Sequence, residues 1–262
     1  MRCIFCKIDS ASSRSIEHII PESLWNRTHV LPAGVVCDKC NNYFSREVEK
    51  PFLESAPVRR LRFEQAIPNK HGRVPPTTAL ILPDIPTILT RPPFGRSGMS
   101  AEVPPGSIER IARSEQLKLA VPASEAAPPG RVVSRFLAKA ALEAMADRLV
   151  AVPDGLEYLV DETQLDPIRN YARRGEPIHD WPYYVRRIHA ADRIFIGCAG
   201  GYEQTVHEYD IFKTDWNEWF FVMAIFGLEL TINYGGPETE GYVRWLSANG
   251  NVSPLYSGKN VP

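Results

Sequence analysis

Apolar positions are unevenly spaced along this chain, and the clearest pattern is a broad apolar face over residues 131–150. Apolar side chains recur there at spacings of three and four residues, which is the period of an α-helix. Because the face is wide, we expect this helix to be largely buried. A second helix is predicted from Glu162 to Arg174, with Pro167 in its first turns and Gly175 as its C-cap.

Short runs rich in β-branched and aromatic residues follow these two helices. The last two runs flank Gly227, which predicts a hairpin at that glycine. Helices followed by such runs are typical of an α+β domain with a mainly antiparallel sheet. The final fifteen residues are predicted to be coil. The runs cover Tyr183–His189, Ile194–Cys198, Thr205–Phe212, Trp219–Phe226 and Leu228–Tyr234.

Proline dominates the middle of the chain, since residues 51–130 contain 14 of the 23 prolines. The apolar runs Thr78–Leu82 and Ile85–Thr90 have edge-strand character, but X-Pro steps interrupt them. We therefore predict three parts. They are an N-terminal domain over residues 1–55, a proline-rich connector over 56–129, and an α+β domain over 130–262.

Four of the five cysteines form two Cys-x-x-Cys pairs in the first forty residues. Two such pairs can surround one tetrahedral zinc, because each short turn presents two thiolates to a common point. A segment this short buries too little apolar surface to fold alone, whereas a structural zinc supplies about 10–16 kcal/mol. A redox dithiol fits less well than a single metal. The predicted Zn²⁺ ligands are Cys3, Cys6, Cys37 and Cys40.

Between the cysteine pairs lies Glu17-His18, and Asn41 directly follows the last cysteine. Adjacent residues of a regular strand point to opposite faces, so Glu17 and His18 can serve one site only if the strand twists or ends there. Pro21 is well placed to end it. The local expectation is a strand over Ser15–Ile20, a loop over 22–34, a strand at Val35–Val36, and a helix from Asp38 that Pro51 kinks or stops.

The order Cys3-x-x-Cys6, Glu17-His18-Ile19-Ile20-Pro21 and Cys37-x-x-Cys40-Asn41 resembles the HNH endonucleases, specifically their zinc-knotted treble-clef (ββα-metal) branch. The resemblance covers about the first 55 residues. It implies a metal-dependent DNA endonuclease that hydrolyses phosphodiester bonds. His18 would be the general base, and Glu17 and Asn41 would hold a catalytic divalent cation, Mg²⁺ or another. Asn42 is the fallback ligand, and helix capping is the simpler role for either asparagine.

This sequence departs from the family pattern at one position. Most HNH motifs have a middle asparagine about five residues before the second cysteine pair, and here Pro32 stands there. Asn26, His29 or a backbone group would then have to hold the loop that carries the histidine.

Charge is unevenly distributed, although the net charge is only −1. Residues 1–75 carry 12 Lys/Arg and 8 Asp/Glu, whereas residues 194–262 carry 3 and 8. The N-terminal part is therefore the expected face for DNA, with RNA not excluded. The expected nucleic-acid contacts are Arg14, Arg27, His29, Lys39, Arg46 and Lys50.

The competing function is a non-catalytic zinc module that binds nucleic acid or protein on a retained HNH fold. The presence of Glu17-His18 together with Asn41 favours catalysis over that alternative. The N-terminus has no apolar secretion segment, and the apolar run Trp219–Leu230 contains Glu229 and is too short to span a bilayer. We therefore expect a cytoplasmic protein without a membrane partner. A homodimer, or a regulatory partner of the C-terminal domain, is left open.

Overall fold

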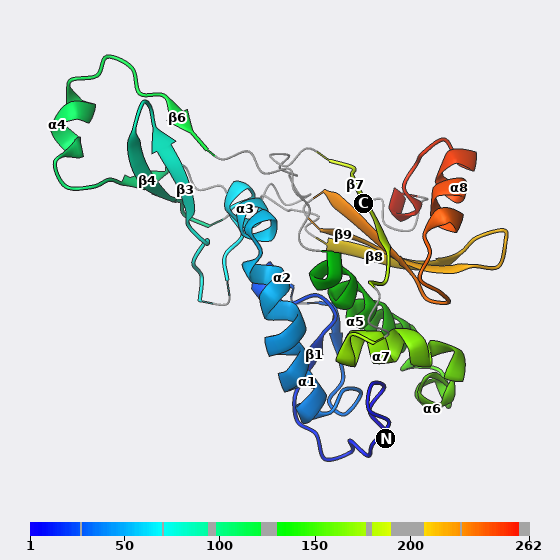
Figure 1. Ribbon diagram of the computed structural model, residues 1–262. Coiled ribbons are helices and arrows are strands. Elements are labelled where there is room, and N and C mark those ends of the chain that lie inside the picture. Colours follow the sequence, from blue (N-terminus) through cyan, green and yellow to red (C-terminus); the bar gives the residue numbers. More distant parts are fainter. Residues whose placement is uncertain are drawn as a thin grey trace, which may run out of the picture.

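The computed structural model describes residues 1–26, 28–69, 71–93, 98–121, 130–176, 180–189, 207–225 and 227–256. Helices and antiparallel sheets are both present, which confirms the predicted fold class (Figure 1). None of the helices in these ranges is long and apolar enough to cross a membrane.

The N-terminal part consists of two very short strands and a long interrupted helix. Strand β1 (Glu17–His18) pairs antiparallel with β2 (Val30–Leu31), so that Glu17 lies opposite Leu31. A 3₁₀ turn, η1 (Glu22–Leu24), lies between them. The helix runs through α1 (Asp38–Phe44), the π-helical segment η2 (Ser45–Glu49) and α2 (Lys50–Glu54).

The structure differs from the local expectations for this part at two points. The second strand is at Val30–Leu31, whereas Val35 is buried and its carbonyl accepts from the Ile4 N–H at 3.0 Å, so it pairs with the first cysteine turn. Of the two outcomes expected at Pro51, a kink or a stop, the stop is excluded, because Pro51 lies in the first turn of α2, where the missing N–H is tolerated. The π-helical segment immediately before Pro51 absorbs the change in hydrogen bonding.

Residues 56–120 contain more regular structure than the expected connector, in which only Thr78–Leu82 and Ile85–Thr90 had edge-strand character. Helix α3 (Ala56–Glu64) is followed by a four-stranded antiparallel sheet in the order β5-β4-β3-β6, which projects away from the rest of the molecule (Figure 1). Pro86 is tolerated in β4 because β5 pairs only with Ile88–Thr90. The elements are β3 (Thr77–Ile81), β4 (Ile85–Thr90), β5 (Ser100–Glu102), α4 (Ser107–Ala112) and β6 (Leu119–Ala120).

The C-terminal part contains a helical group and a second four-stranded sheet. The long helix is α5 (Gly130–Leu149), which confirms the predicted buried helix. It is followed by α6 (Gly155–Asp161), η3 (Thr163–Leu165) and α7 (Asp166–Arg174), and Gly175 ends α7 at φ +72° as predicted.

The second sheet is antiparallel throughout, in the order β7-β10-β9-β8, and β9 and β10 form the hairpin predicted at Gly227. The helix α8 was not anticipated, and the strand expected at Ile194–Cys198 lies outside the described residues. The elements are β7 (Tyr183–Arg187), β8 (His207–Lys213), β9 (Trp219–Ile225), β10 (Leu228–Asn233), α8 (Glu240–Ala248) and η4 (Pro254–Tyr256).

Both faces of this sheet are covered, which explains why β9 is apolar without a break. Phe221, Met223 and Ile225 belong to the large core that includes α5. The alternate residues of β9, such as Phe220, pack with Tyr242 of α8 on the other face.

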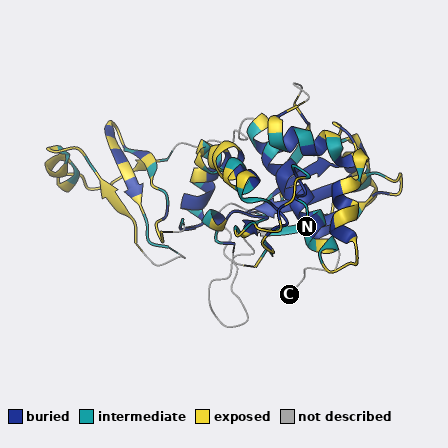
Figure 2. Ribbon diagram, turned by 90° about the horizontal axis from the view of Figure 1, so that it is seen from below, coloured by how far each residue is buried: buried dark blue, intermediate teal, exposed yellow. Residues whose placement is uncertain are grey.

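One hydrophobic core joins the N-terminal part to α5, α7 and the second sheet. The stacked rings of Phe52 in α2 and Phe136 in α5, with centroids 4.0 Å apart, mark this junction. Figure 2 shows most of the buried residues concentrated here, whereas buried and exposed residues alternate in the projecting sheet. The predicted N-terminal and C-terminal domains therefore share their apolar interior, and α5 lies directly behind the zinc segment.

Candidate functional site

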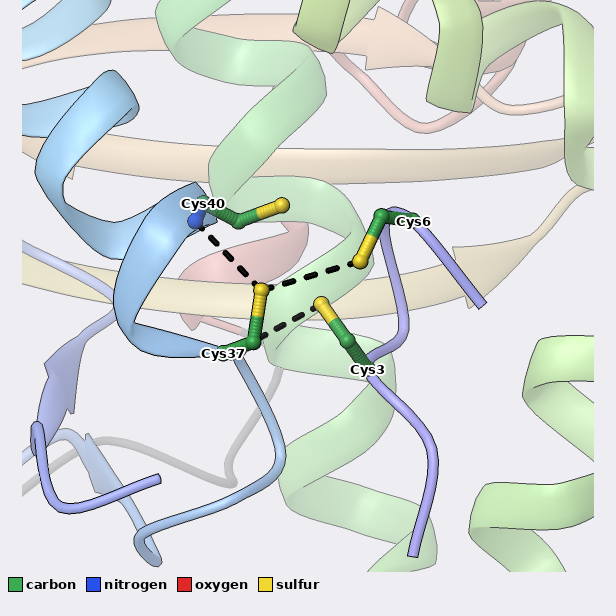
Figure 3. Close-up of side chains that lie close together, drawn as sticks. All are labelled: Cys3, Cys6, Cys37 and Cys40. Carbon is green, nitrogen blue, oxygen red and sulfur yellow. Dashed lines mark hydrogen bonds between the residues drawn. The ribbon is translucent and has the colours of Figure 1, made fainter. Parts of the chain in front are cut away.

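The four paired cysteines converge on one point (Figure 3). Their sulfur atoms all lie within 4.8 Å of one another, and the Sγ atoms of Cys6 and Cys37 are 3.6 Å apart. Cys3 and Cys40 are buried, whereas Cys6 and Cys37 are half-buried.

Local backbone geometry orients the thiols. Cys3 and Lys7 close the first turn, in which the Lys7 N–H donates to the Cys3 carbonyl at 2.9 Å with Lys7 at φ +62°. In the second turn the Cys40 N–H donates to Cys37 Sγ at 3.4 Å, and the Cys37 N–H donates to Cys3 Sγ at the same distance. A hydrogen bond from the Cys40 thiol lowers the pKa of Cys3 to about 4. Burial raises the pKa of Cys6, and the hydrogen bond to Cys3 raises the pKa of Cys40. A bound metal ion would favour the thiolate form of all four side chains.

This arrangement fits zinc. Zn–S bonds of about 2.3 Å in a tetrahedron place the sulfur atoms about 3.8 Å apart. The observed separations are compatible with that value, and backbone N–H groups already point at two of the sulfurs. Four thiolates leave no open position, so the site is structural and not catalytic.

Helices α6 and α7 hold the first cysteine turn in place. Nε of the buried Arg169 donates to the Ile4 carbonyl at 2.8 Å, and Arg169 also pairs with Asp166. Lys7 binds the same carboxylate at 2.7 Å, and Arg2 binds Asp161. The first cysteine turn is thus bound to residues more than 150 positions away in sequence.

Asn26 holds the loop between β1 and β2. Its amide nitrogen donates to the carbonyls of Ile20 at 2.6 Å and His29 at 2.9 Å, and its oxygen accepts from the N–H groups of Thr28 and His29. The side chain is fully buried and uses both amide ends. Most HNH motifs hold this loop with an asparagine at the position of Pro32. In this chain the hydrogen bonds of Asn26 hold the loop instead.

Glu17 and His18 point to opposite sides of β1, as strand geometry requires. The His18 side chain is partly exposed, whereas Glu17 is buried and binds Nζ of Lys139 in α5 at 2.8 Å. In this arrangement the Glu17 carboxylate is engaged by Lys139.

Lys139 is the centre of a buried ionic cluster that also includes Glu17, Glu49 and Glu143. Nζ lies 2.8 Å from Glu17, 2.7 Å from Glu49 and 2.8 Å from Glu143, and it donates to the His18 carbonyl at 3.2 Å. The Lys139 and Glu143 side chains are both fully buried. The ammonium group therefore fixes the strand of His18 from behind.

The charges in this cluster are strongly perturbed. Burial opposes the positive charge of Lys139, but the carboxylates of Glu143, Glu17 and Glu49 outweigh it and raise its pKa well above its usual range. Burial raises the pKa values of Glu17 and Glu143, and Lys139 only partly offsets this. Lys139 thus stays charged, while the two most buried carboxyls hold protons more readily than free glutamate.

Sequence reasoning did not identify this cluster, although one signal was present. Lys139 and Glu143 are four residues apart on the helix that was expected to be largely buried. An opposite-charge pair at this spacing on a buried face indicates a buried ion pair.

Asn41 lies next to the strand of His18. Its amide nitrogen donates to the Ile16 carbonyl at 3.2 Å, and Cys37 is the N-cap of its helix. The Asn41 side chain is therefore held against the strand start and does not cap the helix. Asn42, the alternative ligand, is exposed.

The other expected contacts divide into two groups. Arg14, Lys39, Arg46 and Lys50 are exposed and accessible to a ligand, whereas Arg27 lies outside the described residues. The His29 ring packs edge-on against Tyr209 of β8, with ring centroids 4.9 Å apart. Burial lowers the pKa of His29. His29 therefore contacts the C-terminal sheet, which makes it a packing residue in this structure.

A catalytic cation would have few protein ligands here. Across the described ranges, the four cysteines are the only group of three or more His, Cys, Asp or Glu side chains close enough to hold a metal. The residues around His18 do not form a complete metal site by themselves. A divalent ion that keeps its waters and binds a substrate phosphate needs only one or two protein ligands.

The chain was compared with curated proteins, solved structures and protein-family models. Comparison with curated proteins and with solved structures found no match for this chain. The model of the HNH endonuclease family matches residues 3–56, which span both cysteine pairs, Glu17-His18 and Asn41. The N-terminal segment of this chain is therefore identified as an HNH endonuclease domain.

Proposed function

We propose that the protein is a metal-dependent DNA endonuclease in which His18 is the general base. The observation that carries this proposal is the position of His18. It is partly exposed on a strand held by Asn26 in front and by Lys139 behind, within a segment that matches nuclease domains. Asn41, bonded to Ile16 at the start of the same strand, is the proposed protein ligand of the divalent cation.

Phosphodiester hydrolysis needs a deprotonated water and stabilisation of the charge that develops on the phosphate. The His18 imidazole is exposed enough to reach a water, and an ordinary imidazole accepts a proton near neutral pH. A bound divalent cation would supply Lewis-acid stabilisation of the phosphate oxygens. The chain's own contribution is to hold the imidazole and the Asn41 carboxamide on one rigid support.

Glu17, the other residue expected to hold the cation, is bound to Lys139 in this structure. It would have to leave Lys139 and turn to the His18 side of the strand before it could bind the same cation as Asn41. In the present arrangement its role is to anchor the strand.

His18→Ala is expected to abolish cleavage of supercoiled plasmid in Mg²⁺, Mn²⁺ or Ni²⁺, because added metal does not replace the missing proton acceptor. Zinc content and melting temperature should stay near wild type, since the thiolate site does not involve His18. His71→Ala, on an exposed histidine of the segment before β3, is the matched control and should cleave normally. Full cleavage by His18→Ala would exclude this mechanism.

Asn41→Ala and Glu17→Ala are expected to behave differently from each other. Loss of a metal ligand raises the metal concentration needed for cleavage, so a higher concentration should partly restore Asn41→Ala. Glu17→Ala should mainly lower the melting temperature, because it removes one partner of a buried cluster. Metal titrations and melting curves of both variants check this. A metal-restorable, normally stable Glu17→Ala protein would instead assign Glu17 to the cation.

The second candidate function is a zinc module that binds nucleic acid without cleaving it. The burial of Glu17 favours this alternative, because that carboxylate is not presented to a catalytic cation. Wild-type protein that binds DNA but cleaves neither plasmid DNA nor RNA with any of the three metals would establish it.

A further inference from the structure

A groove beside the HNH segment is lined by a buried arginine, Arg62, whose guanidinium is only partly hydrogen-bonded within the described part of the chain. The groove has a volume of about 600 Å³ and lies between the helix that runs from η2 into α2 and the helix α3. Arg62 of α3 lines it and is 5% exposed. Among the described residues, neither Nε nor Nη2 of Arg62 has a hydrogen-bond partner.

A guanidinium buried in this way is energetically unfavourable, because it has lost water without gaining an acceptor. Burial and the neighbouring Arg59 lower the pKa of Arg62 to about 10, so the group remains charged at neutral pH. An anion placed in the groove would relieve both the missing hydrogen bonds and the repulsion between the two guanidinium groups.

The charge of the groove lining also favours an anionic ligand. Arg46, Lys50, Arg59 and Arg62 line the groove, against the carboxylates of Glu49 and Glu54. Glu49 is already paired with Lys139, and Glu54 lies 3.9 Å from Lys50 in an exposed contact. The groove therefore presents excess positive charge.

The groove is part of the same rigid helix as the proposed site. Arg46 and Lys50 follow Asn41 on the helix that begins at the zinc-binding cysteines. Lys50 comes nine positions after Asn41, which is a rise of about 13 Å along a helix. A ligand that reaches along this helix from Asn41 to the groove would carry negative charge at both ends, as a nucleic-acid strand does.

We propose that this groove binds a backbone phosphate of the nucleic-acid substrate, with Arg62 as the buried anchor and Arg59, Arg46 and Lys50 around it. A planar guanidinium can donate two parallel hydrogen bonds to one phosphate. The proposal rests on the proposed function and extends the binding surface beyond residues 3–56, into α3.

A DNA-binding experiment tests the proposed phosphate site. The zinc-loaded full chain is titrated into a fluorescein-labelled duplex of about two helical turns, without added divalent cation, and binding is followed by fluorescence anisotropy. Arg62→Met is expected to weaken binding about tenfold and to reduce the salt slope by about one. Its melting temperature should be equal to or above wild type, because an unpaired buried charge is removed.

Arg113→Met is the matched control, since it removes the same charge from an exposed residue that follows α4 on the projecting sheet. It should bind nearly as wild type. Arg59→Ala, at an exposed groove position, should weaken binding even if Arg62→Met folds poorly. Arg62→Lys should recover part of the affinity, because it keeps the charge but not the planar fork.

Wild-type affinity in both Arg62→Met and Arg59→Ala, or equal loss in Arg113→Met, would overturn the proposal. Inorganic phosphate is the second probe: if it binds wild type but not Arg62→Met while DNA binding is unchanged, the groove is a site for a free anion. His18→Ala should bind the duplex normally. Cleavage by that variant would therefore contradict the proposed role of His18 without affecting the proposal that the groove binds phosphate.

Discussion

Cys37→Ser is expected to yield protein without zinc in which the N-terminal segment is unfolded. The apparent contribution of a structural zinc site, about 10–16 kcal/mol, is as large as the whole stability of a typical domain. Cys37 also accepts from the Cys40 N–H and caps helix α1, so one substitution removes a ligand and a cap. Elemental analysis and circular dichroism of the purified variant measure both effects.

The loss of folded structure in Cys37→Ser should extend beyond the first fifty residues. Phe44 and Phe52 pack in the same core as α5 and the second sheet, and Arg169 of α7 binds the first cysteine turn. We therefore expect a lowered melting temperature for the whole chain. Cys198→Ser, on the cysteine outside the two pairs, is the matched control and should keep its zinc. A Cys37→Ser protein with full zinc content, or folded wild type without zinc, would contradict the metal assignment.

The parts predicted correctly from the sequence have a strong local signal. Cysteine spacing identified the metal centre, because a Cys-x-x-Cys turn by itself brings two sulfurs together. Periodicity identified α5, since twenty residues of helix give the apolar pattern several turns in which to repeat. Gly227 identified the hairpin between β9 and β10, where its positive φ is needed.

The parts that were missed depend on tertiary contacts. Strands of two residues, such as Val30–Leu31, have no period to detect, so the loop length and the Asn26 hydrogen bonds determine the pairing. Of the projecting sheet, only β3 and β4 had a recognisable strand pattern, and their prolines favoured a connector over a complete sheet, although Pro86 lies where its strand has a free edge. Helix α8 is short and covers a sheet face that local sequence cannot reveal.

The candidate site shows the same division. The sequence places His18 and Asn41 near the zinc, and the structure agrees that both lie on β1 or against its start. It cannot place Lys139, which comes from a helix 121 residues later and holds the His18 carbonyl. The family match ends at residue 56, so this support is supplied by the rest of the chain.

Lys139→Met is expected to destabilise the protein by about 3–5 kcal/mol, because removal of one partner leaves buried carboxylates without their cation. For a chain of this size that corresponds to a fall of roughly 10 °C in melting temperature. Methionine fills a similar volume, so the loss reports charge and not a cavity. Thermal melting followed by circular dichroism measures it.

Glu143→Leu in the same chain should restore part of the stability, since it removes a fully buried carboxylate that lost its partner. Lys39→Met, the same substitution at an exposed position, is the control and should change stability by at most about 0.5 kcal/mol. Because Nζ of Lys139 also holds the His18 carbonyl, plasmid cleavage should fall at temperatures where Lys139→Met is still folded. A variant that melts and cleaves as wild type would show that the buried cluster neither stabilises the core nor positions the base.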